Sequence, residues 1–249
     1  MKRLAVLAVL TFGLAVPSAV LASHSWGNYH WARTSNPFTL KLGDNVSGAW
    51  DDYLITTSNA WSVASVLDTT IVAGQGGRNC KAQTGRVEVC NRAYGYNGWL
   101  GLAQIWISGS HITKGTAKMN DSYFSLSQYN NKNEKLHVMC QEVGHTFGLD
   151  HQSENGDSLD TCMDYYYNSD TDTLSTHPNA HDYEQLETIY ANTDSTTTLA
   201  SGADGGPGKG KPQKIRDDLF VEDLGNGVRR FTFVYWVNPG IPHDFPQVD

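Results

Sequence analysis

Residues 141–151 read Q-E-V-G-H-T-F-G-L-D-H and place an amide, a carboxylate and two imidazoles within one short segment. Gln141 and His145 are one helical turn apart, so both side chains can reach one ion from the same face of a helix. Glu142 is offset around the helix and can hold a water beside that ion. A sharp turn after the helix would return His151 to the ion as a third ligand. The spacing therefore predicts a metal site with an adjacent carboxylate.

The segment resembles the signature H-E-x-x-H-x-x-G-x-x-H of zinc endopeptidases, with one departure. Glu142, His145 and His151 match the signature. Gly148 matches it too, and a glycine tolerates the positive φ at which a helix can end abruptly. Gln141 stands where the signature has its first His. Its amide oxygen is a neutral donor with the right reach, but it binds zinc less well than imidazole does. The resemblance thus implies a zinc site formed by Gln141, His145 and His151, with reduced affinity.

A second motif lies just downstream, where residues 162–165 read C-M-D-Y. It resembles the Met-turn of the metzincins, the clan of zinc endopeptidases that carries this extended signature. In that clan a Met lies in a tight turn beneath the metal, and in several members a Tyr two residues later reaches the zinc or the transition state. Met163 and Tyr165 occupy these places. Looser similarity to the matrixins covers residues 101–104, 116–124 and 177–186, so that the resemblance spans roughly residues 36–191.

The resemblance implies an α/β (α+β) fold, namely a metzincin-like catalytic domain with a mixed twisted sheet, an active-site helix and a Met-turn. It implies a secreted zinc-dependent endopeptidase that acts as a monomer on a protein or peptide substrate. Glu142 would serve as the general base, and Tyr165 would stabilise the oxyanion. In the family an extended peptide pairs with an exposed edge strand, a place that we assign to residues 99–107.

Two other functions remain open. A non-catalytic metzincin-fold protein that binds a peptide or a glycan would account for Gln141, although a dead site has no chemical need for Glu142. A copper oxidase with an N-terminal His brace would require cleavage after Ser23, so that His24 became the first residue. Cleavage after Ala22 fits the small-residue rule better. The metal content of the purified protein would separate the three functions. Zinc would indicate the endopeptidase, no metal the binding protein, and copper the oxidase.

The remaining histidines receive no ligand role. His137 lies one turn before Gln141 and two turns before His145, too far along a straight helix to share an ion with His145. We therefore expect His137 at the surface or behind the ligands. Surface or capping roles are expected for three further residues, His111, His177 and His181.

The N-terminus indicates export. Residues 1–22 combine Lys2 and Arg3 with an apolar run and a V-L-A cleavage site, a pattern typical of a signal peptide. That run is too short to span a bilayer, and no later segment is long and apolar enough. A formal net charge of −8 argues against nucleic acid or an anionic membrane as the main partner. After the signal peptide we expect a metallopeptidase domain, a flexible linker and a C-terminal segment, over residues 23–191, 192–213 and 214–249.

Four cysteines in an exported chain predict two disulfides, for which three connectivities exist. Metal ligation is the rival interpretation, and the spacing of the cysteines is not that of a zinc knuckle. Within the metzincin interpretation we favour Cys140–Cys162, which would tie the active-site helix to the Met-turn. The other pair, Cys80–Cys90, would close a hairpin.

Hydrophobic patterning predicts an alternation of strands and helices. Strands are expected at residues 38–42, 69–73, 85–90, 99–107 and 112–119. A first helix is expected over residues 49–64 with Ser47 as its cap, and the active-site helix over residues 134–147 with Asn133 as its cap. The buried stripe of the active-site helix consists of Leu136, Met139, Cys140, Val143 and Phe147. The predicted site residues on this helix would then face a cleft.

A hairpin is expected near the C-terminus. Residues 219–236 show a strong hairpin pattern, with Asn226 and Gly227 at the turn. An isolated hairpin is marginally stable in water, so this one should dock on the catalytic domain or on a partner. We expect its aromatic stripe, Phe231, Phe233 and Tyr235, to serve in packing.

Overall fold

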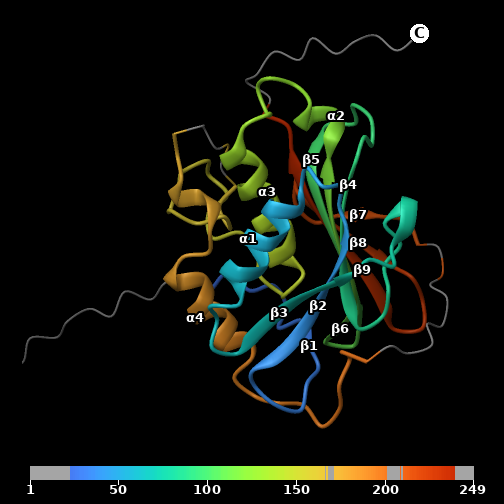
Figure 1. The fold of residues 1–249 in the computed structure, drawn as a ribbon. Coiled ribbons are helices and arrows are strands. Elements are labelled where there is room, and N and C mark those ends of the chain that lie inside the picture. Colours follow the sequence, from blue (N-terminus) through green and yellow to red (C-terminus); the bar gives the residue numbers. More distant parts are fainter. Residues whose placement is uncertain (1–22, 166, 168–170, 201–207, 209, 239–249) are drawn as a thin grey trace, which may run out of the picture.

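The computed structural model describes residues 23–165, 167, 171–200, 208 and 210–238, and the expected signal peptide lies outside this range. The chain forms a mixed α/β structure in which one nine-stranded sheet is packed against helices (Figure 1). The strands are β1 (His30–Trp31), β2 (Phe38–Asn45), β3 (Leu67–Ala73), β4 (Arg86–Arg92), β5 (Trp99–Ser108), β6 (His111–Asn120), β7 (Gln213–Lys214), β8 (Leu219–Asp223) and β9 (Val228–Trp236). The helices are α1 (Asp51–Trp61), α2 (Asp121–Phe124), α3 (Lys132–His145) and α4 (Ala180–Ile189), with short 3-10 turns at Gly77–Asn79 and Leu174–Thr176.

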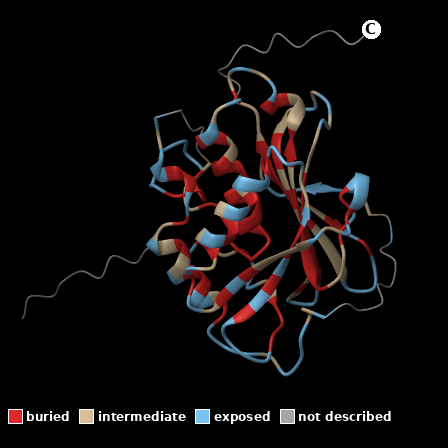
Figure 2. Cartoon of the chain, viewed as in Figure 1, coloured by how far each residue is buried: buried red, intermediate tan, exposed pale blue. Residues whose placement is uncertain are grey.

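The sheet has the order β3-β2-β4-β6-β5-β9-β8-β7, and β1 also pairs with β6. Strands β3, β2, β4 and β6 run parallel, whereas β5, β9, β8 and β7 continue the sheet in antiparallel pairs. Helices α1, α3 and α4 lie on one side of the sheet, and the buried residues concentrate between these layers (Figures 1 and 2). The mixed sheet of the expected fold class is therefore present, and each expected strand coincides with an observed one.

Both predicted helices are present, but their caps were wrong. Helix α1 starts after Trp50 and has no side-chain cap, because Ser47 closes a turn with its carbonyl oxygen instead. In α3 the cap is Asn131, whose side chain accepts from the backbone N–H of Glu134, while the expected cap, Asn133, lies inside the helix. Both Asn residues have capping chemistry, so the pattern alone could not choose between them.

Helix α3 is buried and held from several directions. Its predicted apolar stripe is buried as expected, with every member at most 5% exposed. Two indoles also bond to its C-terminal half: Trp61 donates to the carbonyl of Cys140 (3.1 Å), and Trp31 donates to that of Thr146 (2.9 Å). Hydrogen bonds to carbonyls near a helix end satisfy groups that lack helical partners. The end of α3 that carries the site is therefore anchored to the core.

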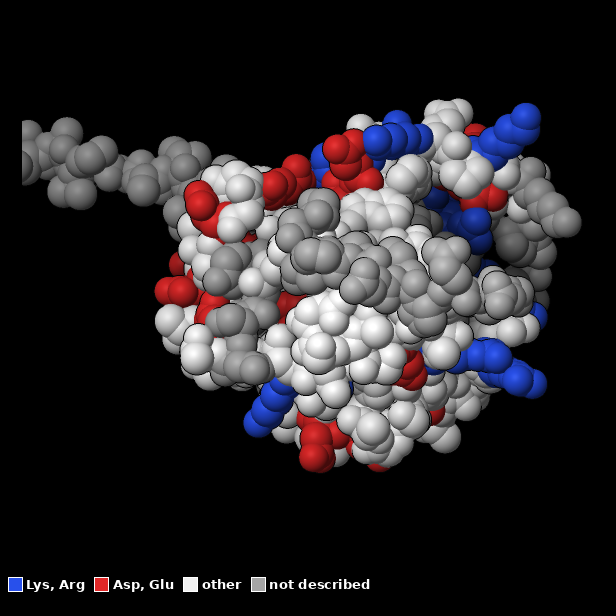
Figure 3. Space-filling model, turned by 90° about the horizontal axis from the view of Figure 1, so that it is seen from above, with Lys and Arg blue, Asp and Glu red and all other residues white. Residues whose placement is uncertain are grey.

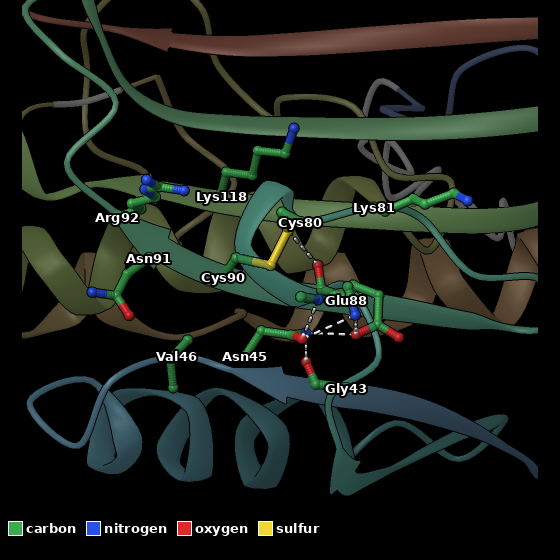
Figure 4. The surroundings of a disulfide bond; sticks show 12 residues. Gly43, Asn45, Val46, Cys80, Lys81, Glu88, Cys90, Asn91, Arg92 and Lys118 are labelled. Carbon is green, nitrogen blue, oxygen red and sulfur yellow. Dashed lines mark hydrogen bonds between the residues drawn. A yellow bond between two sulfur atoms is a disulfide. The ribbon is translucent and has the colours of Figure 1, made fainter.

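Both predicted disulfides are present. Cys140–Cys162 joins α3 to the segment that follows residues 141–151, and Cys80–Cys90 joins a short loop to β4. Figure 4 shows the second bond beside Asn45, whose side chain donates to the Gly43 carbonyl and to Glu88. The disulfide does not close the hairpin we expected, because β3 and β4 both run parallel to β2; Cys80 instead ends a 3-10 turn that precedes β4.

The turn after α3 depends on Gly148. Its φ is +98°, and a Cβ added there would lie 2.2 Å from the carbonyl oxygen of Tyr29. We expect Gly148→Ala to lower the free energy of unfolding by on the order of 3 kcal/mol, from backbone strain and overlap together. Gly156 is the matched control, since its φ is +86° and its Cβ would meet nothing within 4 Å. Gly156→Ala should cost about 1 kcal/mol. Equal losses in urea titrations would show that the contact with Tyr29 is unimportant.

Candidate metal centre

Two imidazoles converge where α3 ends. The Nε2 atoms of His145 and His151 lie 3.1 Å apart, close to the separation of about 3.3 Å expected for two nitrogens bound tetrahedrally to one zinc. The Nδ1 of His145 lies 2.9 Å from the carbonyl oxygen of Leu149, and the Nδ1 of His151 lies 3.2 Å from a carboxylate oxygen of Asp218. Metal-binding histidines usually donate their second ring N–H to such acceptors. Both Nε2 atoms are thus oriented for one shared ion.

The two imidazoles differ in protonation without a metal. Burial lowers the pKa of His145 to about 3, so its ring is neutral and its Nε2 is an acceptor. Burial also lowers the pKa of His151, but hydrogen bonds to Asp218 and Glu154 outweigh this effect and raise it to about 9. The Nε2–H of His151 then donates to His145, and a cation between the two rings would take the place of that proton.

Gln141 presents an amide oxygen that has no partner among the described residues. Its Nε2 donates to the carbonyl oxygens of Cys162 (2.9 Å) and Asp164 (2.6 Å), which fixes the orientation of the amide. The Oε1 atom is buried and has no hydrogen bond to any described residue. A buried acceptor without a donor is costly, so this atom fits a cation as its partner. The amide oxygen has the chemistry expected of a third ligand.

The carboxylate of Glu142 is similarly isolated. The residue is fully buried, and neither carboxylate oxygen accepts a hydrogen bond from a described side chain. It lies against β5, because a Cβ at Gly101 would fall 2.4 Å from its Oε1. Burial raises the pKa of Glu142 well above its usual range, and the charge of His151 offsets this only in part. A carboxyl group in such a position suits proton transfer better than structural pairing.

Met163 lies under the end of α3. A Cβ at Gly144 would fall 2.5 Å from its Sδ atom, so the absence of a side chain at Gly144 lets the sulfur approach the helix. The adjacent disulfide Cys140–Cys162 fixes this segment to the helix. Met163 therefore packs against Gly144, the residue before His145. The carbonyls of its two chain neighbours accept the hydrogen bonds that orient the amide of Gln141.

Tyr165 is near the histidines but is engaged elsewhere. Its ring makes an edge contact with His151 at a centroid distance of 5.3 Å and stacks on Tyr235 at 5.1 Å. Its hydroxyl oxygen accepts from the backbone N–H of Trp236 at 2.8 Å. Burial raises the pKa of Tyr165 to about 12, so the hydroxyl keeps its proton at neutral pH. In this conformation the predicted oxyanion donor is bound to the C-terminal hairpin.

The C-terminal hairpin covers the histidines, which corrects two predictions. Strand β5 is not an edge strand, because β9 pairs with it over most of its length. The predicted site residues do not face an open cleft either: Phe233 of β9 stacks on His145 at 4.2 Å with the rings 7° from parallel. His145 is 1% exposed and His151 7%. The aromatic stripe packs as expected, and the surface that it covers is the candidate centre.

Ionic contacts attach the residues just before the hairpin to the loop after α3. Arg216 donates to both carboxylate oxygens of Asp150 at 2.6 and 2.7 Å, and it also pairs with Asp218 and Glu154. Asp218 in turn forms an ion pair with His151. The sequence pattern missed Asp218 and Arg216, since they lie far along the chain and belong to no motif. A pocket of about 540 Å³ borders Tyr165, Arg216 and Trp236 beside the covered centre.

Two further histidines, His137 and His24, lie near the candidate centre without belonging to it. Of the two places expected for His137, the structure shows the one behind the ligands: the residue is fully buried, and its two ring nitrogens lie 2.5 Å from the Ser175 carbonyl oxygen and 3.1 Å from that of Asp164. It therefore supports the segment that also orients Gln141. His24 has its Nδ1 3.1 Å from the carbonyl oxygen of Asp150, which occupies the atom that a copper brace would need.

No model of a known protein family matches the chain, and no curated protein matches it. Among the described residues no helix is long and apolar enough to cross a membrane. The two disulfides are compatible with an extracellular protein. Figure 3 shows acidic and basic side chains on the same face, with uncharged residues between them.

Proposed function

We propose that the protein is a secreted zinc-dependent endopeptidase whose metal is held by Gln141, His145 and His151. The observation that carries the proposal is the 3.1 Å approach of two imidazole Nε2 atoms whose Nδ1 atoms already have acceptors. The unpartnered Oε1 of Gln141 supplies a third donor of suitable chemistry. Two nitrogens and one oxygen are a donor set that zinc accepts in catalytic sites.

Zinc, when bound, acts as a Lewis acid and lowers the pKa of a water ligand. The carboxylate of Glu142 then orients the attacking water through a hydrogen bond and takes its proton. Glu142 returns this proton to the leaving amine as the peptide bond breaks. Its raised pKa makes the carboxylate a stronger base for the first transfer, because a carboxyl group of ordinary acidity would hold the proton less well. Tyr165, once released from Trp236, has its hydroxyl free to donate to the oxyanion.

Peptide hydrolysis requires that the hairpin move. Strand β9 occupies the side of β5 on which an extended peptide would pair, and Phe233 lies directly on His145. We therefore propose that the described conformation is latent, and that displacement of β9 opens the centre to substrate. The contacts of Arg216 with Asp150 and Glu154 are partly exposed and would be the first to separate.

The closed centre also favours a second candidate, a non-catalytic protein of the same architecture that binds a peptide or a glycan. Elemental analysis combined with digestion of casein separates the two functions. The endopeptidase should contain zinc and cleave casein after the hairpin has been loosened by low concentrations of urea. Absence of zinc after purification in zinc-containing buffer would overturn the proposal.

The role of Gln141 has a direct test. Gln141→His should bind zinc at least tenfold more tightly, because an imidazole is the better donor at the same helical position. Gln141→Leu should bind at least tenfold more weakly, since an apolar side chain of similar size leaves two ligands. Competition titrations against a chelator measure both changes.

The control for these variants is Gln75→Leu, which alters an exposed glutamine outside the centre. Its zinc affinity should equal that of the unmodified protein. Equal affinities of Gln141→Leu and the unmodified protein would remove Gln141 from the ligand set.

A further inference from the structure

A second group of potential ligands lies outside the proposed centre. The Nε2 atoms of His30 and His111 are 3.3 and 3.2 Å from the same carboxylate oxygen, Oδ1 of Asp194. One ligand atom from each of the three residues lies within 4.8 Å of the others. The residues come from β1, from β6 and from the segment after α4, so the fold brings together three distant parts of the chain.

The two imidazoles are placed by strand pairing. Strands β1 and β6 run parallel, and His30 and His111 are direct partners in their register. Their rings meet edge to face at a centroid distance of 5.0 Å. The position of each ring is therefore fixed by backbone hydrogen bonding and does not depend on a flexible loop.

The carboxylate is oriented by Arg33. Its Oδ2 atom accepts from the backbone N–H of Arg33 at 3.2 Å and from Nη1 of the same residue at 3.0 Å. The backbone N–H of Asp194 also donates to the Arg33 carbonyl at 2.8 Å. These bonds engage one carboxylate oxygen and turn the other, Oδ1, toward the two histidines.

The hydrogen bonding of His30 favours a cation at this point. Its Nδ1 lies 2.8 Å from the carbonyl oxygen of Asn28, a contact that holds the ring in one orientation. The Nε2 atom faces Oδ1 of Asp194 at 3.3 Å. An imidazole nitrogen and a carboxylate oxygen at this separation can both bind one ion. A fixed Nδ1–H is also the usual arrangement of a metal-bound imidazole.

We propose that His30, His111 and Asp194 form a second zinc site. Two imidazole nitrogens and one carboxylate oxygen suit zinc better than calcium or magnesium, which prefer oxygen ligands. The side chains are 17%, 33% and 17% exposed, so a water molecule can complete a tetrahedral set. The ion joins β1 and β6 to the segment that leads toward the C-terminal hairpin. The site stabilises the fold and does not depend on peptidase activity.

The test is the number of zinc ions bound per chain, measured by elemental analysis and by titration with zinc alone. The unmodified protein should bind two ions, and His145→Ala should retain one. His111→Ala should also retain one, and the double variant should retain none. His177→Ala, a change at an exposed histidine outside both groups, should leave two ions.

A thermal readout separates ligand loss from misfolding. His111→Ala and the milder His111→Gln should melt like the unmodified protein in a chelator, and zinc should raise their melting temperatures less. The proposal is overturned if His145→Ala binds no zinc, or if His111→Ala leaves both the stoichiometry and the affinity unchanged. A failure of the first centre alone gives a different result. The unmodified protein and His145→Ala should then each bind one zinc ion, and His111→Ala should bind none.

Discussion

In the low urea that loosens the hairpin, replacing Glu142 with Gln is expected to reduce casein cleavage by roughly 10²- to 10⁴-fold, the usual contribution of a general base. Gln has nearly the same shape but cannot take a proton from the attacking water. Zinc content should be unchanged, because Glu142 is placed beside the ligands and is not one of them. Stability should not fall, since burial already disfavours the charged form of this carboxyl group. Cleavage assays and elemental analysis on one sample check both expectations.

The matched control for this variant is Glu184→Gln, which changes a carboxylate that is 67% exposed on α4. It should cleave casein at the unmodified rate. Full activity in Glu142→Gln would end the assignment of the base. Loss of zinc together with activity would instead make Glu142 a ligand.

A disulfide between β5 and β9 should hold the enzyme in its latent form. Gln104 and Thr232 are direct partners in the β5–β9 register, and their side chains are hydrogen-bonded at 3.2 Å. Paired residues in antiparallel strands have Cα atoms about 4.5–5.5 Å apart, within the range that a disulfide accepts. In the oxidised variant Gln104→Cys/Thr232→Cys we expect casein cleavage to fall at least tenfold. Removal of zinc by a chelator should slow by a similar factor, because β9 can no longer leave His145.

Each single substitution serves as a control, because it introduces a thiol without the cross-link. Both single variants should cleave casein and release zinc like the unmodified protein. If the cross-linked protein released zinc as fast as the single variants, β9 would not have to move for access to the centre. That result would refute latency while leaving the zinc site itself intact.

Local features of this chain were predictable, and long-range ones were not. Residues 141–151 specify a helix, a glycine turn and two converging imidazoles because their spacing acts within a few residues. The pattern around Asn226 and Gly227 specifies a hairpin for the same reason. No local pattern states which strand will pair with β9, so the burial of His145 under Phe233 could not be foreseen. The approach of His30 to Asp194 likewise depends on tertiary packing.

The position of β9 also has a consequence for the order of assembly. The ligand residues of α3 are synthesised well before the strand that covers them, and β5 and β6 can pair without that strand. Metal can thus enter freely only in the interval between formation of α3 and docking of β9. An ion acquired in that interval becomes trapped beneath Phe233, whereas a chain that closes empty must reopen to be loaded. If zinc is the ion, as proposed, its abundance where the chain folds would decide, together with the affinity of the centre, what fraction of molecules carries it.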